Sequence, residues 1–228
     1  MATHPLKIIA RIHTDFPDKF GIPRQSGMVE ELKGQIVFEP EYRNPDAVRG
    51  LEDFSHIWLI WEFSEAIRED WSPTVRPPRL GGNTRKGVFA TRSPFRPNPI
   101  GLSSVKLDMI SFNDENGPVL HVSGADLMDG TPVYDVKPYI PFTDSHPEAI
   151  GGFADEHVND RLQVRFPNHF LKIIPSNKQN ALLEVLSLDP RPSYQDDGER
   201  SYGLEFAGFD VQFQVQDDVL TVCEVLKK

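Results

Sequence analysis

The chain has 228 residues, of which 39% are hydrophobic, with 15 Phe and 3 Trp, enough for a sizeable core in one large domain or in a main domain plus a smaller one. The net charge of −10 argues against a general DNA-binding protein, and the single cysteine excludes an internal disulfide and any metal site built from several cysteines. No secretion signal is evident and no run approaches the ~18 apolar residues of a membrane span, so we expect a soluble, cytoplasmic protein with no membrane partner.

The first third of the chain predicts three β-strands. Apolar runs place them over residues 8–12, 34–38 and 54–63, with a polar connector over 42–51. The third run is aromatic, β-branched and nearly unbroken, which indicates a strand buried on both faces at its centre.

Two places beside these strands carry candidate functional side chains. Pro23, Arg24 and Gln25 put a cation and an amide next to a proline in the loop after the first strand, although a solvated loop is the simpler interpretation. Ser64 and Glu65 stand where the third strand ends, a usual position for functional groups on a sheet scaffold.

The span between Asp70 and Asp108 contains no acidic residue but holds seven Lys and Arg and six Pro. Its centre, residues 87–103, predicts a short apolar strand and then a stiff, mostly extended loop carrying Arg92 and Arg96, because proline fixes φ. Guanidinium groups on a stiff loop suit recognition of carboxylate, phosphate or nucleotide. One basic patch in an acidic chain is compatible with nucleic acid binding at that place. Pairing with the chain's own carboxylates is the alternative.

The following segment predicts further strands over residues 102–109, 119–122 and 133–137, with a hairpin turn at Asn116-Gly117. Six or seven closely spaced strands therefore precede residue 145 without a convincing helix. This pattern predicts an antiparallel β-barrel or sandwich.

Asp126 and Asp129 lie in the turn over residues 126–132, where favourable turn chemistry is the simplest reason for them. Together with the arginines, they could bind a zwitterionic, ribose-containing ligand, with carboxylates for hydroxyls and ammonium and Arg for a carboxylate. The histidines lack ligand spacing, so we expect no metal, and neither a Gly-x-Ser-x-Gly elbow nor a phosphate-binding loop is present.

The C-terminal part predicts a small α+β unit after a polar linker over residues 145–160. Its expected elements are a strand, a helix capped by Asn177 and a terminal hairpin, over residues 162–166, 178–188, 209–215 and 219–225. Cys223 lies in the alternating run of the last strand, which predicts a small core residue. Residues 190–194 predict a second rigid cationic loop.

Five ordered motifs resemble the TrmO (TsaA-like, YaeB-like) family. They are GVFATRSPFRPNPIGLS at 87–103, VRGL with FSH at 48–56, PPRLGG at 77–82, DLMDGTP at 126–132 and DVKPY at 135–139. The likeness covers about residues 1–142, and DPRP at 189–192 extends it into the C-terminal unit.

The resemblance implies a tRNA methyltransferase that uses S-adenosyl-L-methionine to methylate N6 of threonylcarbamoyladenosine at position 37 of threonine tRNA. It also implies a mainly β protein. Residues 1–144 would form an antiparallel single-sheet β-barrel that binds the cofactor, and residues 161–228 a small α+β domain that contacts tRNA. The family works as a homodimer.

Carried onto this sequence, the resemblance implies cofactor contacts from loops and strand ends. These are Pro23, Arg24, Gln25, Ser64, Glu65, Arg92, Leu102, Asp126, Leu127, Met128 and Asp129. Ser64-Glu65 departs from the His-Gln of some relatives, which leaves open whether this pair uses side chain or backbone.

For the substrate we expect contacts from Arg96, Asn98, Lys137 and Tyr139, with charge for phosphate or the threonyl carboxylate and a ring for stacking. The urea-like N6 is a poor nucleophile until its proton leaves, so a carboxylate or water must accept that proton. Asp126, Asp129 and Asp135 are equal candidates, and the catalytic residue stays unassigned.

Two other functions fit the same residues. One is a non-catalytic barrel module that binds a nucleotide or tRNA. The other is a methyltransferase of the same fold that acts on a small metabolite, which would not need the basic span.

Overall fold

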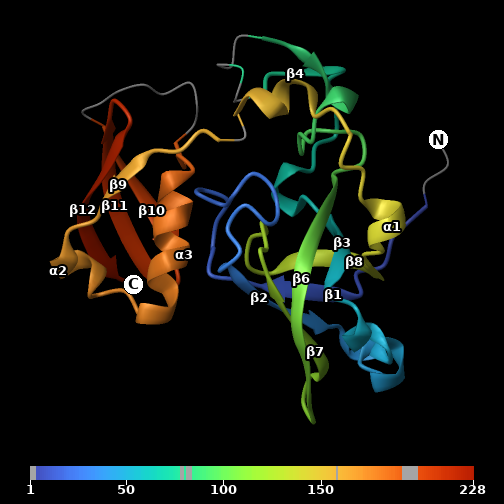
Figure 1. Cartoon of the computed structure of the whole chain (residues 1–228). Helices are drawn as coiled ribbons and strands as arrows, with labels where there is room; N and C mark the ends of the chain where they lie inside the picture. Colours follow the sequence, from blue (N-terminus) through green and yellow to red (C-terminus); the bar gives the residue numbers. More distant parts are fainter. Residues whose placement is uncertain (1–3, 78–79, 81–83, 158, 192–199) are drawn as a thin grey trace.

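The computed structural model describes residues 4–77, 80, 84–157, 159–191 and 200–228. Its larger part is a closed barrel of six antiparallel strands in the order β1-β2-β7-β6-β3-β8 (Figure 1). The strands are β1 Ala10–His13, β2 Lys33–Phe38, β3 His56–Glu62, β6 Ile100–Asn113, β7 Gly117–Ser123 and β8 Thr131–Pro138. The predicted antiparallel single-sheet barrel is confirmed.

Every second side chain along the strands points inward, and these side chains fill the barrel. In β3, Ile57, Leu59 and Trp61 point into the core, whereas Trp58 and Ile60 are only half-buried on the outer face. The expected burial of this strand on both faces is therefore wrong. Bulky side chains continue on the outer face because it is partly covered rather than solvated.

Three loops meet at one end of the barrel, which we call the mouth. They are residues 14–32 between β1 and β2, residues 63–99 between β3 and β6, and residues 124–130 between β7 and β8. The opposite end carries the β6–β7 hairpin turn, where Gly117 adopts φ +63°, as the Asn-Gly signal predicts. The mouth thus collects most of the expected cofactor residues.

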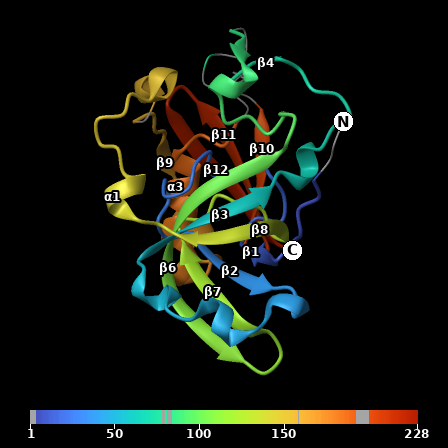
Figure 2. The same cartoon turned by 90° about the vertical axis from the view of Figure 1, so that its right-hand side faces the viewer.

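The C-terminal unit is a four-stranded sheet in the order β10-β11-β12-β9, with helix α3 packed against it (Figure 1). In Figure 2 this unit lies behind the barrel. Its elements are β9 Gln163–Arg165, α2 Asn168–Leu171, α3 Ser176–Ser187, β10 Ser201–Phe206, β11 Phe209–Gln216 and β12 Val219–Lys227. The expected strand, helix and hairpin are present. The helix starts earlier than expected, with Pro175 rather than Asn177 at its N-cap, and α2 and β10 are additional.

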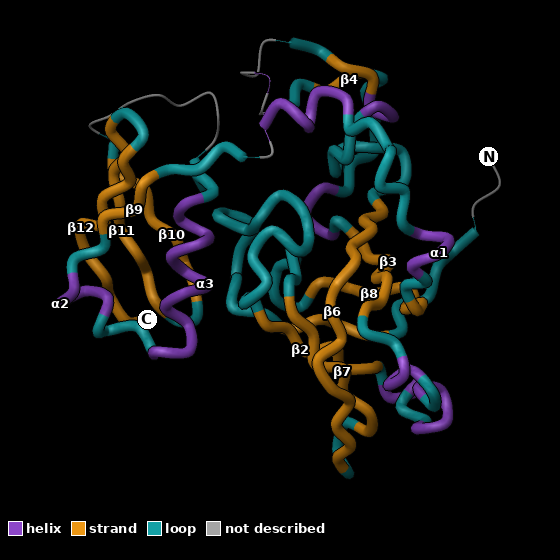
Figure 3. Tube along the Cα trace, in the orientation of Figure 1, coloured by secondary structure: helices purple, strands orange, loops and turns teal. Residues whose placement is uncertain are grey.

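Several connections contain short structures that the sequence did not predict (Figure 3). The expected strand at residue 87 is only the two-residue β5 Lys86–Gly87, paired with β4 Thr74–Val75, and Val88–Ala90 forms a 3-10 helix. A short helix, α1 Pro141–Asp144, also precedes residue 145. Pro141 at the first position of α1 has a fixed φ that suits a helix start.

Two β-bulges invert expected burial. The alternation of Val105 and Leu107 predicts that Met109 faces inward too, but a bulge between Leu107 and Met109 leaves Met109 exposed. Cys223 was expected in the core, but it is the extra residue opposite the bulge at Gln212/Phe213 and is exposed. A bulge adds one residue to one strand, so the alternation changes phase there.

The barrel and the C-terminal sheet have separate hydrophobic cores, but one loop of the barrel contributes residues to the core of the C-terminal sheet. Phe16, Val29 and Leu32, from the loop over residues 14–32 of the barrel, are buried in the C-terminal core. Among the described residues, no helix is long and apolar enough to span a membrane.

Candidate functional site

A buried chain of hydrogen bonds leads from the barrel core to Asp126 at the mouth. The indole Nε1–H of Trp61 donates to the Ser103 hydroxyl over 3.0 Å, and that hydroxyl donates to Asp126 Oδ1 over 2.6 Å. Trp61 and Ser103 are both buried. Their bonds fix the carboxylate with one oxygen tied to the barrel interior.

The surroundings of Asp126 raise its pKa to about 6. Burial is the main cause, because it penalises the charged form. The hydrogen bond from Ser103, the positive charge of Arg92 and the backbone amide of Ser26 act in the opposite direction. Asp126 therefore titrates close to neutral pH, as a proton-transfer group requires.

Arg92 stands at the same place. Its guanidinium donates to the side-chain oxygen of Gln25, and Arg92 itself is exposed. Gln25 also donates to the carbonyl of Arg24. The Gln25 side chain thus accepts from one N–H group of the Arg92 guanidinium, and the other N–H groups remain available to an anion.

The loop over residues 14–32 closes over these residues. The Ser26 hydroxyl accepts from the backbone amide of Ser104 at 3.2 Å, and the amide of Gly27 donates to the carbonyl of Gly124 at 2.9 Å. Gln25, Arg92 and Asp126, predicted from distant parts of the sequence, are brought together at one point.

The remaining expected cofactor residues surround this point in different ways. Ser64 and Glu65 form a 3-10 turn at the end of β3, and Glu65 lies 3.9 Å from the ammonium of Lys19 on the loop over residues 14–32. Leu102 is exposed on the outer face of β6, beside Ile60 of β3.

The last four expected cofactor contacts differ in whether their side chains are exposed. The side chains of Pro23 and Leu127 are buried, so a ligand at the mouth could meet these two residues only through the backbone. Arg24 is exposed on the same loop as Pro23. The carbonyl of Met128 accepts hydrogen bonds from Thr131 and closes the turn.

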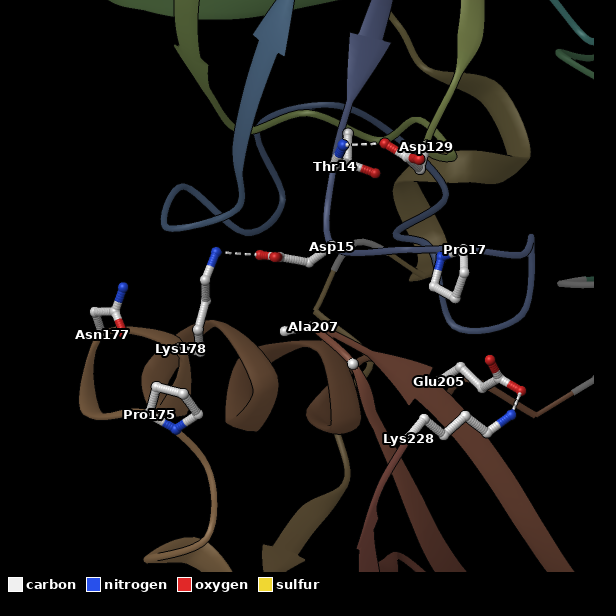
Figure 4. A pocket seen from close by; sticks show the side chains of 11 residues that line it. Thr14, Asp15, Pro17, Asp129, Pro175, Asn177, Lys178, Glu205, Ala207 and Lys228 are labelled. Carbon is white, nitrogen blue, oxygen red and sulfur yellow. Dashed lines mark hydrogen bonds and ion pairs between the residues drawn. The ribbon is translucent and has the colours of Figure 1, made fainter.

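Asp129 faces away from Asp126, toward the C-terminal unit. Its carboxylate accepts from the Thr14 backbone amide at 3.0 Å and lies 3.1 Å from His13 Nδ1. Figure 4 shows it at the edge of a cleft of about 600 Å³ between the barrel and the C-terminal sheet. The two carboxylates of the 126–132 turn therefore lie in different places, Asp126 at the mouth and Asp129 at the cleft beside the C-terminal unit.

Two expected substrate residues, Arg96 and Asn98, lie on the mouth loop over residues 63–99. The Arg96 guanidinium folds back to donate to the carbonyls of Thr91 at 2.9 Å and Ser93 at 3.4 Å, which stiffens the proline-rich loop. Asn98 is exposed, and its carbonyl accepts from Ile100.

The other two, Lys137 and Tyr139, lie at the far end of β8 from the mouth. Lys137 pairs with Asp135 at 2.8 Å, and the Tyr139 ring contacts Trp58 with centroids 5.4 Å apart. Across the sheet, however, Lys137 pairs with Trp58 of β3 and Trp58 pairs with Ser104 of β6, so two strand spacings, about 10 Å, separate Lys137 from Ser104. Lys137 is exposed on the outer face of the sheet, two strands from the strand that carries Ser103.

Part of the basic span and of the second cationic loop falls outside the described residues, including Arg79, Gly81-Gly82 and residues 192–194. In the part of the chain that is described, no group of three His, Cys, Asp or Glu is arranged to hold a metal ion.

Sequence reasoning missed Ser103, Trp61 and Ser26 as parts of the site. A signal for Ser103 existed. Val105 and Leu107 face inward, and extending their alternation back by one step places a polar Ser103 in the core, where it needs a partner.

Known proteins resemble the chain over its whole length. Family models of the tRNA-methyltransferase O N-terminal domain and of the TrmO C-terminal domain match residues 11–145 and 159–228. A tRNA (adenine(37)-N6)-methyltransferase of Escherichia coli K12 is 40% identical over 225 residues, 95% of either chain. A probable S-adenosyl-L-methionine-binding protein of Pyrococcus abyssi is 32% identical over 74% of this chain and 88% of its own length.

The fold agrees with these matches. A crystal structure of TrmO from Pseudomonas aeruginosa superposes with a TM-score of 0.78 at 32% identity, over 100% of this chain and 99% of that one. Both domains, their order and the barrel are shared along the full chain. This protein therefore belongs to the tRNA-methyltransferase O (TrmO) family.

Proposed function

We propose that this protein transfers the methyl group of S-adenosyl-L-methionine to N6 of threonylcarbamoyladenosine at position 37 of threonine tRNA. The observation that carries the proposal is the juxtaposition of Arg92 and Asp126 at the mouth of a TrmO barrel. A tRNA substrate would place the reaction in the cytoplasm.

The residues at the mouth fit the proposed cofactor. Arg92, held by Gln25, offers donors to its carboxylate, and the exposed Leu102 offers apolar surface on the adjoining strand. When bound, the cofactor supplies an electrophilic methyl group on a sulfonium. The chain's own part is to fix the nucleophile in line with that group and to exclude water, and such positioning lowers the barrier.

Among the three candidate carboxylates, Asp126 is the one that we propose as proton acceptor for N6. It is part-buried, its pKa is raised to about 6 and its orientation is fixed by Ser103. Asp129 is engaged by His13 and Thr14, and Asp135 is paired with Lys137.

We further propose that the protein forms a homodimer. Large exposed apolar side chains on the loop over residues 63–99 and the start of β6 provide surface for a partner. They are Ile67, Trp71, Phe89, Phe95, Ile100 and Leu102. A monomer at micromolar concentration in light scattering would contradict this assembly.

The function is tested by radiolabelled methyl transfer to total tRNA from a strain lacking the enzyme, followed by nucleoside analysis. We expect label on threonylcarbamoyladenosine, and none when the tRNA comes from cells that cannot make that nucleoside. Binding of tRNA without transfer would indicate a non-catalytic module. Label on a small molecule but not on tRNA would indicate a metabolite methyltransferase.

Replacing Ser103 with alanine is expected to move the pH dependence of methyl transfer. Ser103 lowers the pKa of Asp126, so its loss raises that pKa further, by about one unit for a hydrogen bond to a charged group. The acidic limb of the kcat/KM profile should shift to higher pH. Ser104→Ala, which keeps the backbone bond to Ser26, is the matched control. If the acidic limb is unchanged in Ser103→Ala, the ionisation that causes this limb is not that of Asp126.

A further inference from the structure

The loop over residues 14–32 belongs to the barrel by connectivity but to the C-terminal unit by packing. It joins β1 to β2, yet Phe16, Val29 and Leu32 are at most 3% exposed in the C-terminal core, and Phe20 and Ile22 pack against that core. Both ends of the loop are thus seated on a sheet that lies far along the chain.

Polar contacts fix the same two ends. At the first, the carbonyl of Asp15 accepts from the Ala207 amide at 2.8 Å, and its carboxylate pairs with Lys178 of α3, as Figure 4 shows. At the second, Asn180 of α3 donates to Glu31 at 3.3 Å. Helix α3 therefore holds both ends of the loop.

An aromatic contact adds to these bonds. The Phe16 ring meets Phe206 of β10 edge-on, with centroids 5.2 Å apart. The carbonyl of Phe16 accepts from the Asp129 amide at 2.8 Å, so the 124–130 loop at the mouth is tied to the same anchor.

The middle of the loop reaches the candidate site. Gln25 accepts the hydrogen bond of Arg92, the amide of Ser26 favours the charged form of Asp126, and Gly27 is bonded to Gly124. No residue of the C-terminal unit needs to touch a ligand to affect it, because the unit determines where Gln25 and Ser26 stand.

We infer that the C-terminal unit is a positioning element of the cofactor site, acting through Lys178 and Phe206 on the loop that holds Arg92 and Asp126. This role is separate from any contact with tRNA. The inference rests on the proposed function, since it takes the mouth to be the cofactor site.

The test measures S-adenosyl-L-methionine affinity by calorimetry without tRNA, on the full chain. In Lys178→Ala combined with Phe206→Leu we expect affinity to fall about fivefold, the size of effect typical of a positioning contact. Lys172→Ala removes the same charge from an exposed position nearby and should bind as the unaltered protein does. Neither altered residue lies at the mouth, so a change in cofactor affinity has to be transmitted by the loop.

Hydrogen exchange supplies the second readout. The Gly27 amide should lose protection in the altered protein while the barrel strands keep theirs. Loss of Gly27 protection with unchanged cofactor affinity would overturn the inference. If the double variant fails to fold, Lys178→Ala alone decides, because that side chain is 25% exposed. An unaltered protein that does not bind the cofactor would instead refute the proposed function.

Discussion

Replacing Arg92 with alanine is expected to weaken binding of S-adenosyl-L-methionine by about ten- to a hundredfold while the fold survives. A charge-assisted hydrogen bond to a carboxylate contributes about 1.5–3 kcal/mol, which corresponds to that range. Arg92 is exposed, so its removal leaves no cavity. The loss of its positive charge also raises the pKa of Asp126, because Arg92 helps to stabilise the charged carboxylate.

Isothermal calorimetry of the free protein measures this effect directly, and thermal unfolding checks that the barrel is intact. Arg165→Ala, a change of the same kind at an exposed position in β9, serves as the control and should leave affinity unaltered. Arg92→Lys is expected to recover only part of the affinity, since lysine lacks the planar fork that Gln25 and an anion share. Full affinity in Arg92→Ala would remove Arg92 from the cofactor site.

The barrel could be predicted from sequence because the alternation of apolar and polar residues is a local signal. The prediction of which side chains face inward fails where a strand is irregular. The same rule that places Val105 and Leu107 inside wrongly places Met109 and Cys223 inside. At each of the two wrong positions a bulge changes the phase. The choice of a bulge depends on the partner strand, which a single run of residues does not contain.

Part of the candidate site could likewise be predicted from the sequence, and part could not. The family motifs name Gln25, Arg92 and Asp126, and the fold brings all three to the mouth. The loop over residues 14–32 is different. Its apolar residues have no helical or strand period and are interrupted by Gly and Pro, so nothing local indicates that they pack on a sheet about 180 residues away.

The second large effect is expected from Asp126→Asn. We expect methyl transfer to fall by about a hundred- to ten-thousandfold, the usual contribution of a general base, with cofactor affinity changed little. Asn keeps an oxygen to accept from Ser103, so the local hydrogen bond remains. In the unaltered protein kcat/KM should fall as pH drops through about 6, and the variant should lack this limb. Asp114→Asn, at the exposed hairpin turn, is the control.

The same substitution should stabilise the protein, which distinguishes the proposed base from a residue kept for folding. The pKa of Asp126 is raised from 3.8 to about 6, so the folded state binds the proton more tightly than the unfolded state does. The stabilisation by the protonated form is complete below pH 3.8 and is lost as pH rises through 6. Above that pH, the buried charge costs at most about 3 kcal/mol.

Urea unfolding at pH 8 and at pH 4 tests this balance. Asp126→Asn should be more stable than the unaltered protein at pH 8, and the difference should shrink toward pH 4, where the unaltered carboxyl is protonated too. A variant that is inactive and less stable at pH 8 would make Asp126 a structural residue. Loss of activity together with gain of stability at pH 8 is the result that the proposal requires.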